Sequence, residues 1–183
     1  MNIENNYNIL GSLDSSEVIE KLQQVDWTEW TLRQDSFPVH KKTHSVPLYW
    51  GRGIGSDIIS HKENCSLFEE ELNIIKNLFD HYYSAEFFYT KALFAQLKKQ
   101  ESIDSHYDSA ALFSITHRIH WCIQGDYLKL DFLVNDEKLD IKKNDIFEMN
   151  NKKMHSVDYN GDEPRIHMIC DFISKKNYNE FWK

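Results

Sequence analysis

The sequence predicts a mainly β protein with flanking helices, folded as a double-stranded β-helix, or jelly roll. Two observations lead to this prediction. Residues 14–25 and 67–83 carry apolar residues at helical spacing, whereas the chain from residue 85 onward consists of short runs rich in β-branched and aromatic residues. Several closely spaced strands after two helices are typical of two packed sheets with the helices against one outer face.

The N-terminal part, residues 1–84, is expected to contain the helices and a lead-in to the sheet. A short amphipathic helix is expected within residues 14–25. Residues 26–50 are rich in aromatic residues and are expected to be extended, and residues 51–56, GRGIGS, to form a loop. The most regular helical stripe spans residues 67–83, where three glutamates occupy the first turns and interact favourably with the helix dipole.

The β core is expected at residues 85–174, within a single domain that spans residues 1–183. A chain of 183 residues is long enough for one well-packed core, and no repeat or Pro/Gly-rich linker divides it. The strand-like runs are EFFYTKALFAQL, ALFSITHRIHWCIQ, YLKLDFLV, DIFEMN, HSVDYN and PRIHMICDFI.

Composition argues against several classes of function. A net charge of -8 does not favour nucleic-acid binding, which draws most of its affinity from clustered Lys and Arg. Three cysteines without CxxC spacing indicate reduced thiols rather than a disulfide framework or a zinc knuckle. Residues 1–10 lack the pattern of a secretory signal, and no apolar run is long enough to span a membrane, so a cytoplasmic protein with no membrane partner is expected.

Two histidines and one carboxylate form a candidate metal site. His106 and Asp108 stand two residues apart and share a face if the segment is extended, although a lone HxD is a weak signal. His155 supplies a third ligand late in the β region, and Arg165 follows ten residues later. Two histidines and a carboxylate leave three positions of an Fe(II) ion open, whereas a structural zinc site closes its shell with four protein ligands.

The alternation of residues in two strands indicates a polar pocket. Arg118 and His120 share one face of residues 111–124, opposite an apolar face. Arg165 and His167 likewise share a face of the last long strand. Buried arginines need anionic partners, and 2-oxoglutarate carries two carboxylates.

These motifs resemble the aspartyl/asparaginyl β-hydroxylase-like family of Fe(II)/2-oxoglutarate-dependent oxygenases, and within it the proline cis-hydroxylase-like branch. The resemblance covers roughly residues 33–172. The residues that carry it are FPVHKKTHSVPLYW, HYD at 106–108, HRIHWCI at 117–123 and MHSVDYNGDEPRIHMICDF at 154–172.

The resemblance implies a dioxygenase that uses Fe(II), 2-oxoglutarate and O2 to hydroxylate an amino acid or a peptide or protein side chain, with succinate and CO2 as products. It implies that His106, Asp108 and His155 are the catalytic iron ligands. Arg165 is then the partner of the distal carboxylate of 2-oxoglutarate. The identity of the substrate and the oligomeric state do not follow from the sequence.

The resemblance also assigns Arg118 and His120 to holding 2-oxoglutarate near the metal. Two features depart from the family pattern. A serine that some members use for 2-oxoglutarate is replaced by Ala95, and KKQES stands where a Pro-Gly turn is usual before the first metal histidine. Arg33 and His40, in the polar lead-in, are candidates for substrate binding, with a surface or structural ion pair as the alternative for Arg33.

Other interpretations remain open from the sequence. His106 and Asp108 as a surface pair, with His155 in a loop and Arg165 in a structural ion pair, is the simplest alternative. A cupin-like metal enzyme that does not use 2-oxoglutarate would keep the β architecture without needing Arg165. A non-catalytic jelly-roll module that binds a sugar or peptide would need no metal.

Overall fold

The computed structural model describes residues 3–182, so Met1, Asn2 and Lys183, which the predicted domain of residues 1–183 includes, lie outside the described part. The elements are β1 (Tyr7–Ser12), α1 (Ser16–Leu22), α2 (Leu32–Ser36), η1 (Pro38–His40), β2 (Thr43–Gly51), β3 (Ile58–Ser60), α3 (Lys62–Leu67), α4 (Glu69–Tyr83), β4 (Phe87–Leu97), β5 (Glu101–His106), η2 (Ala111–Ser114), β6 (Thr116–Gln124), η3 (Tyr127–Lys129), β7 (Leu130–Val134), β8 (Glu137–Lys138), β9 (Asp145–Met149), β10 (His155–Tyr159), β11 (Arg165–Ser174) and α5 (Lys175–Phe181).

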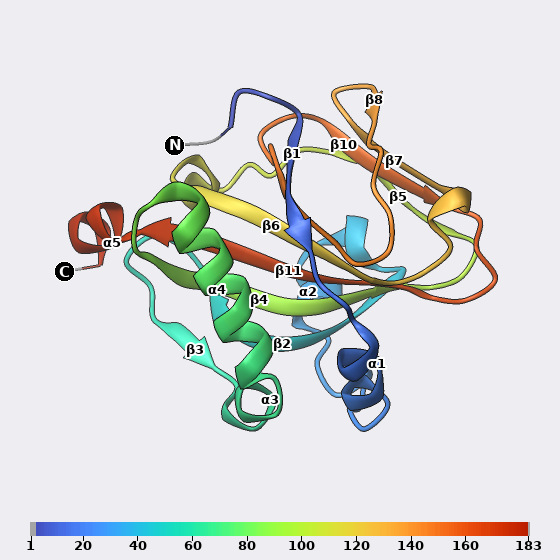
Figure 1. The fold of residues 1–183 in the computed structure, drawn as a ribbon, viewed down its shortest axis with the longest axis horizontal. Helices are drawn as coiled ribbons and strands as arrows, with labels where there is room; N and C mark the ends of the chain where they lie inside the picture. Colours follow the sequence, from blue (N-terminus) through green and yellow to red (C-terminus); the bar gives the residue numbers. More distant parts are fainter. Residues whose placement is uncertain (1–2, 183) are drawn as a thin grey trace.

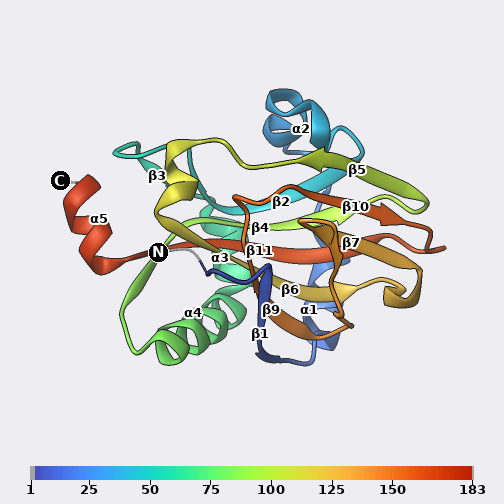
Figure 2. The same ribbon diagram turned by 90° about the horizontal axis from the view of Figure 1, so that it is seen from above.

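Two antiparallel sheets form the body of the protein. The large sheet has the strand order β1-β9-β6-β11-β4-β2-β3 and the small sheet the order β5-β10-β7-β8. Figure 1 shows the small sheet above the central strands of the large one, and Figure 2 gives the view from above. Apolar side chains from both sheets, among them Leu97, Phe132, Phe147 and Val157, are buried together between them. This arrangement confirms the predicted jelly-roll architecture.

Helices cover the outer face of the large sheet, as predicted. Side chains of α1 and α4 and the residue between α3 and α4, including Leu22, Phe68 and Phe79, are buried in one cluster with residues of the central strands. On β6, Ile119 and Trp121 belong to this outer cluster. Because side chains alternate along a strand, the intervening residues of β6 face the space between the sheets. The predicted alternation of faces is therefore confirmed for the strand itself.

The N-terminal part differs from the prediction in several places. Residues 26–40 are not extended, because they contain the short helices α2 and η1 before β2 begins. Helix α3 precedes the predicted helix 67–83, which begins at Glu69. These helices have five, three and six residues, too few for a periodic stripe to be recognised, and tertiary packing decides their conformation. Strands β1, β2 and β3 also join the large sheet, so this sheet crosses the expected boundary at residue 84.

None of the helices within residues 3–182 combines the length and the apolar character that a bilayer span requires.

Candidate metal and co-substrate site

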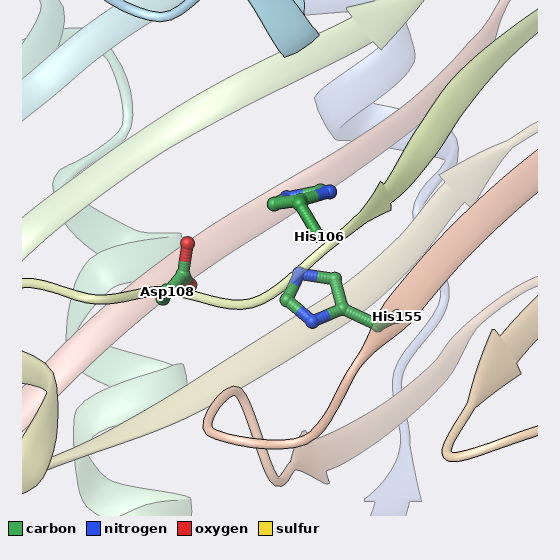
Figure 3. A group of neighbouring side chains, drawn as sticks. All are labelled: His106, Asp108 and His155. Atoms are coloured by element: carbon green, nitrogen blue, oxygen red, sulfur yellow. The ribbon is translucent and has the colours of Figure 1, made fainter.

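The three predicted metal ligands lie where β5 and β10 pair. His106 ends β5 and stands directly opposite His155, which begins β10, with 4.3 Å between the ring centroids. Asp108 lies beyond the end of β5, where its backbone N–H donates to the carbonyl of Asn151 at 3.2 Å. Figure 3 shows the three side chains gathered at this end of the small sheet, and one ligand atom from each lies within 4.8 Å of the others. A surface pair with a separate loop histidine does not describe this geometry.

Backbone carbonyl groups orient both imidazole rings. Nδ1 of His106 lies 2.7 Å from the carbonyl oxygen of Asp104, and Nδ1 of His155 lies 2.9 Å from that of Lys153. A carbonyl oxygen can only accept, so each Nδ1 carries a proton and each Nε2 is the ring nitrogen left to bind a metal. Metal-binding histidines are commonly held in this way by their second ring nitrogen.

The protonation states of His155 and Asp108 also suit a cation. Burial is the main cause that lowers the pKa of His155 to about 4, so its imidazole is neutral at pH 7. Burial acts to raise the pKa of Asp108, but the charge of Arg118 and the two neighbouring histidines bring it below its ordinary value. The site therefore presents a neutral imidazole from His155 and a carboxylate from Asp108 beside the imidazole of His106.

Arg118 bridges the candidate metal site and the last strand. Its Nη1 donates to Oδ2 of Asp108, while its Nε and Nη2 donate to the two carboxylate oxygens of Asp171 at 2.7 and 2.9 Å. Asp171 is fully buried and stands opposite Arg118 in the pairing of β11 with β6. Burial opposes the charge of Arg118, but the two carboxylates raise its pKa above the ordinary value. Arg118 therefore holds Asp108 in place, a role that the sequence did not suggest.

Arg165 lines a cavity that His106 and His155 also line. Its side chain is 3% exposed. Within the described residues, Nε and Nη1 of this guanidinium have no hydrogen-bond partner, and its carbon Cζ lies 5.8 Å from the ring centroid of Phe132. A buried cation with unpaired N–H groups is unfavourable unless an anion binds to it. The alternative of a structural ion pair for Arg165 is wrong in this structure, since no carboxylate pairs with it among residues 3–182.

His120 lines the same cavity, next to His167. The two Nδ1 atoms are 3.2 Å apart, and neither Nε2 has a hydrogen-bond partner in the described part of the chain. Burial lowers the pKa of both imidazoles well below 6.5. Both rings are therefore neutral, and each offers an unpaired nitrogen.

Arg33 and His40 also lie at the cavity, on α2 and η1. Nη1 of Arg33 donates to the hydroxyl groups of Thr43 at 3.2 Å and Ser45 at 3.5 Å. Burial, followed by the repulsion of nearby cations, lowers the pKa of Arg33 to about 9. The ring of His40 lies 5.7 Å from that of His106 between centroids. Arg33 is thus neither in a surface ion pair nor distant from the candidate metal site.

Two residues near the site had no assigned role in the sequence. Asp171 closes the block 154–172, but a lone carboxylate on a strand gives no sign of the arginine that it contacts. Ser45 stands directly opposite Ala95 in the pairing of β2 with β4 and is fully buried. A hydroxyl group on the neighbouring strand thus lies beside the position at which the expected serine is missing, and only the register of β2 and β4 reveals it.

Several solved structures share the fold. The prolyl hydroxylase of Trichoplax adhaerens, in complex with a hypoxia inducible factor peptide, aligns with a TM-score of 0.65 and 13% identity over 97% of this chain and 87% of that one. A 2OG-Fe(II) oxygenase family oxidoreductase from Burkholderia pseudomallei aligns with a TM-score of 0.64 and 14% identity, over 86% of this chain and 76% of that one. The epimerase SnoN, in complex with Fe3+, alpha ketoglutarate and nogalamycin RO, aligns with a TM-score of 0.61 and 12% identity, over 92% of this chain and 79% of that one. At such low identity these similarities support the fold alone.

A search of curated proteins gave no match. The sequence model of the aspartyl/asparaginyl β-hydroxylase family matches residues 6–175. This range includes both sheets and every candidate site residue, and it agrees with the resemblance of the sequence motifs. The chain therefore belongs to the aspartyl/asparaginyl β-hydroxylase family.

Proposed function

We propose that this protein is an Fe(II)- and 2-oxoglutarate-dependent dioxygenase that hydroxylates an amino acid or a peptide or protein side chain and releases succinate and CO2. The observation that carries the proposal is a two-histidine, one-carboxylate cluster whose histidines line the same cavity as a buried guanidinium with unpaired N–H groups. Family membership supports the same reaction.

The donor set fits an iron ion. His106 and His155 offer their Nε2 atoms, and Asp108 offers a carboxylate oxygen. Three protein ligands leave room for a bidentate co-substrate and O2, as in the facial triad of non-haem Fe(II) oxygenases. Arg118 restrains the carboxylate of Asp108 from the outside, as carboxylates that bind metals commonly require.

The part of the cavity at Arg165 fits the second carboxylate of 2-oxoglutarate. Nε and Nη1 of Arg165 both lack a hydrogen-bond partner among the described residues, and a guanidinium matches a planar carboxylate better than an ammonium group does. The neutral ring of His120 lines one side of this part of the cavity, and Phe132 and Leu97 make its other walls apolar. Apolar walls exclude water and strengthen the pairing of the carboxylate with Arg165.

When bound, iron and 2-oxoglutarate supply the oxidising power with which O2 hydroxylates a C–H bond. The protein holds the reacting groups close together and keeps them dry. Arg33 and His40, which line the cavity beside the cluster, are the proposed substrate-binding residues.

The two rival functions make different demands on these residues. A metal enzyme that does not use 2-oxoglutarate leaves the buried charge of Arg165 without a partner. A metal-free binding module gives no reason for the convergence of His106, Asp108 and His155. A location in the cytoplasm is also part of the proposal, and it is supported by the three free cysteines.

The decisive experiment separates metal binding, co-substrate binding and turnover. Titration of the metal-free protein with Mn(II), a redox-stable substitute for Fe(II), should give one site, and 2-oxoglutarate should bind only after the metal. With Fe(II), ascorbate and 2-oxoglutarate, a panel of amino acids and peptides is then screened for stimulated succinate release. His155→Ala should abolish metal binding, whereas His81→Ala, at an exposed histidine on α4, is the matched control. Absence of metal-dependent 2-oxoglutarate binding refutes the proposal.

A further inference from the structure

We propose that Lys91 is a specificity-determining residue which, together with Arg33, binds the carboxylate of an anionic substrate on the side of the cavity facing Asp108. This inference rests on the proposed function and identifies the chemical class of the substrate. Lys91 lies on β4 and lines the space that also contains Asp108 and Arg33. It belongs to neither the metal cluster nor the co-substrate pocket.

The ammonium group of Lys91 is enclosed by rings. Its Nζ lies 4.3 Å from the ring centroid of Trp50 and 5.1 Å from that of Phe113. Its side chain is 12% exposed. Such contacts hold the ammonium group in place and shield it from water, and no hydrogen bond from Nζ is found within residues 3–182.

The carboxylate closest to Lys91 is already engaged. Oδ2 of Asp171 lies 4.0 Å from Nζ, beyond hydrogen-bond distance, and both oxygens of Asp171 accept from Arg118. Burial lowers the pKa of Lys91 to about 8, although the charge of Asp171 acts against this change. Lys91 is therefore a desolvated cation with spare donors, and a bound anion stabilises it.

The charges around the cavity show the same imbalance. Within residues 3–182, the cations that line this cavity and the neighbouring space at Lys91 are Arg33, Lys91, Arg118 and Arg165, and the carboxylates in contact with them are Asp108 and Asp171. Four cations against two carboxylates leave two positive charges. Fe(II) carries two positive charges and 2-oxoglutarate two negative ones, so together they add no net charge. The two excess positive charges of the protein therefore remain for the substrate to neutralise.

The distribution of acids also distinguishes among substrates. Both carboxylates near Lys91 have assigned partners, Asp108 in the metal cluster and Asp171 on Arg118. An α-ammonium group would therefore approach Lys91 and Arg33 without a free carboxylate to receive it. Leu93, Ile169 and Trp50 give the same space an apolar wall. The substrate class is thus a carboxylic acid with an apolar body and no free ammonium group beside the carboxylate, which narrows the amino acid of the proposed function to an N-acylated one or to the C-terminal residue of a peptide.

The test uses the full-length protein loaded with Mn(II) and N-oxalylglycine, an unreactive analogue of 2-oxoglutarate, so that only the substrate side is open. The probes are 4-methylpentanoate, its primary amide and L-leucine, which share one carbon skeleton and differ in charge. Calorimetry measures each affinity. We expect the carboxylate to bind about 10-fold to 150-fold more tightly than the amide, as for a hydrogen bond to a charged group, and L-leucine to bind more weakly than the carboxylate.

Variants then assign the preference to Lys91. Lys91→Met should remove the preference for the carboxylate and leave binding of Mn(II) and N-oxalylglycine unchanged, which also shows that the variant is folded. Lys91→Arg, which keeps the positive charge, should keep the preference for the carboxylate over the amide. Lys99→Met, at an exposed lysine, should leave this preference unaltered.

The two levels of the proposal fail in different ways. If Mn(II) does not promote binding of N-oxalylglycine, the proposed function is wrong. If N-oxalylglycine binds but the protein does not distinguish the carboxylate from the amide, or Lys91→Met keeps the distinction, the assignment of Lys91 is overturned while the proposed function stands.

Discussion

Replacement of Arg165 by methionine should change co-substrate binding and folding stability in opposite directions. Methionine keeps much of the length of the side chain but removes the guanidinium, which is 3% exposed and has two nitrogen atoms without partners among the described residues. Loss of a buried partner of a carboxylate weakens binding by about 2–5 kcal/mol. This corresponds to a loss of about 30-fold to 5000-fold in the affinity for 2-oxoglutarate.

The folded protein without ligands should not suffer from the same change. In that state Arg165 is a buried cation that burial destabilises, as the lowered pKa of its guanidinium indicates. Replacement of buried charges by apolar groups of similar volume is commonly neutral, or stabilising by about 1–4 kcal/mol. We therefore expect the free energy of unfolding of Arg165→Met to equal or exceed that of the wild type.

Two measurements test this reasoning. Calorimetric titration of the Mn(II)-loaded protein with 2-oxoglutarate gives the affinity, and urea unfolding of the metal-free protein gives the stability. Arg52→Met, at an exposed arginine outside the deep cavity, is the matched control and should change neither value. If Arg165→Met binds 2-oxoglutarate as tightly as the wild type, the carboxylate partner is misassigned. If the variant is strongly destabilised instead, the role of Arg165 is structural.

Three further outcomes follow from the same structure. Loss of a residue that only supports a metal ligand lowers metal affinity roughly 10- to 100-fold, and Asp108→Ala should lower Mn(II) affinity by more than this. If calorimetry finds an unchanged affinity, Asp108 is not a metal ligand. Because burial keeps the pKa values of His120 and His167 well below 6.5 in the folded state, the unfolded chain takes up more protons as the pH falls below 6.5. These two residues should thus make the metal-free protein less stable at pH 5.5 than at pH 7 by about 2–3 kcal/mol, and the lowered pKa of His155 adds to this loss; equal urea midpoints at the two pH values contradict this. Gly125 has φ of +134°, and a Cβ there would lie 3.1 Å from Cγ of Arg165. Gly125→Ala should therefore destabilise the fold by about 1–3 kcal/mol and weaken 2-oxoglutarate binding while Mn(II) binding persists, whereas intact co-substrate affinity would show that the guanidinium tolerates displacement.

Patterns of nearby residues were sufficient for much of the fold and for the candidate site. Strand alternation assigned Arg118 and His120 to the inner face of β6, because side chains two positions apart share a face whatever the rest of the chain does. The HxD pair, the distal histidine and Arg165 were recognisable because their residue types and order are unusual together. Short helices without a periodic stripe escaped prediction, so Arg33 was expected in an extended segment and lies instead on α2.

Contacts between distant segments carry the remaining information about the site. Pairing of β5 with β10 places His106 opposite His155, and pairing of β11 with β6 places Asp171 beside Arg118. Lys91 reaches the cavity through the place of β4 between β11 and β2. A strand pattern specifies which face a residue occupies, but strand order and register are set by packing of the whole chain. The residue types therefore predicted a metal ion and an acidic co-substrate. Long-range strand pairing decided which of the described cations remain without a free carboxylate partner.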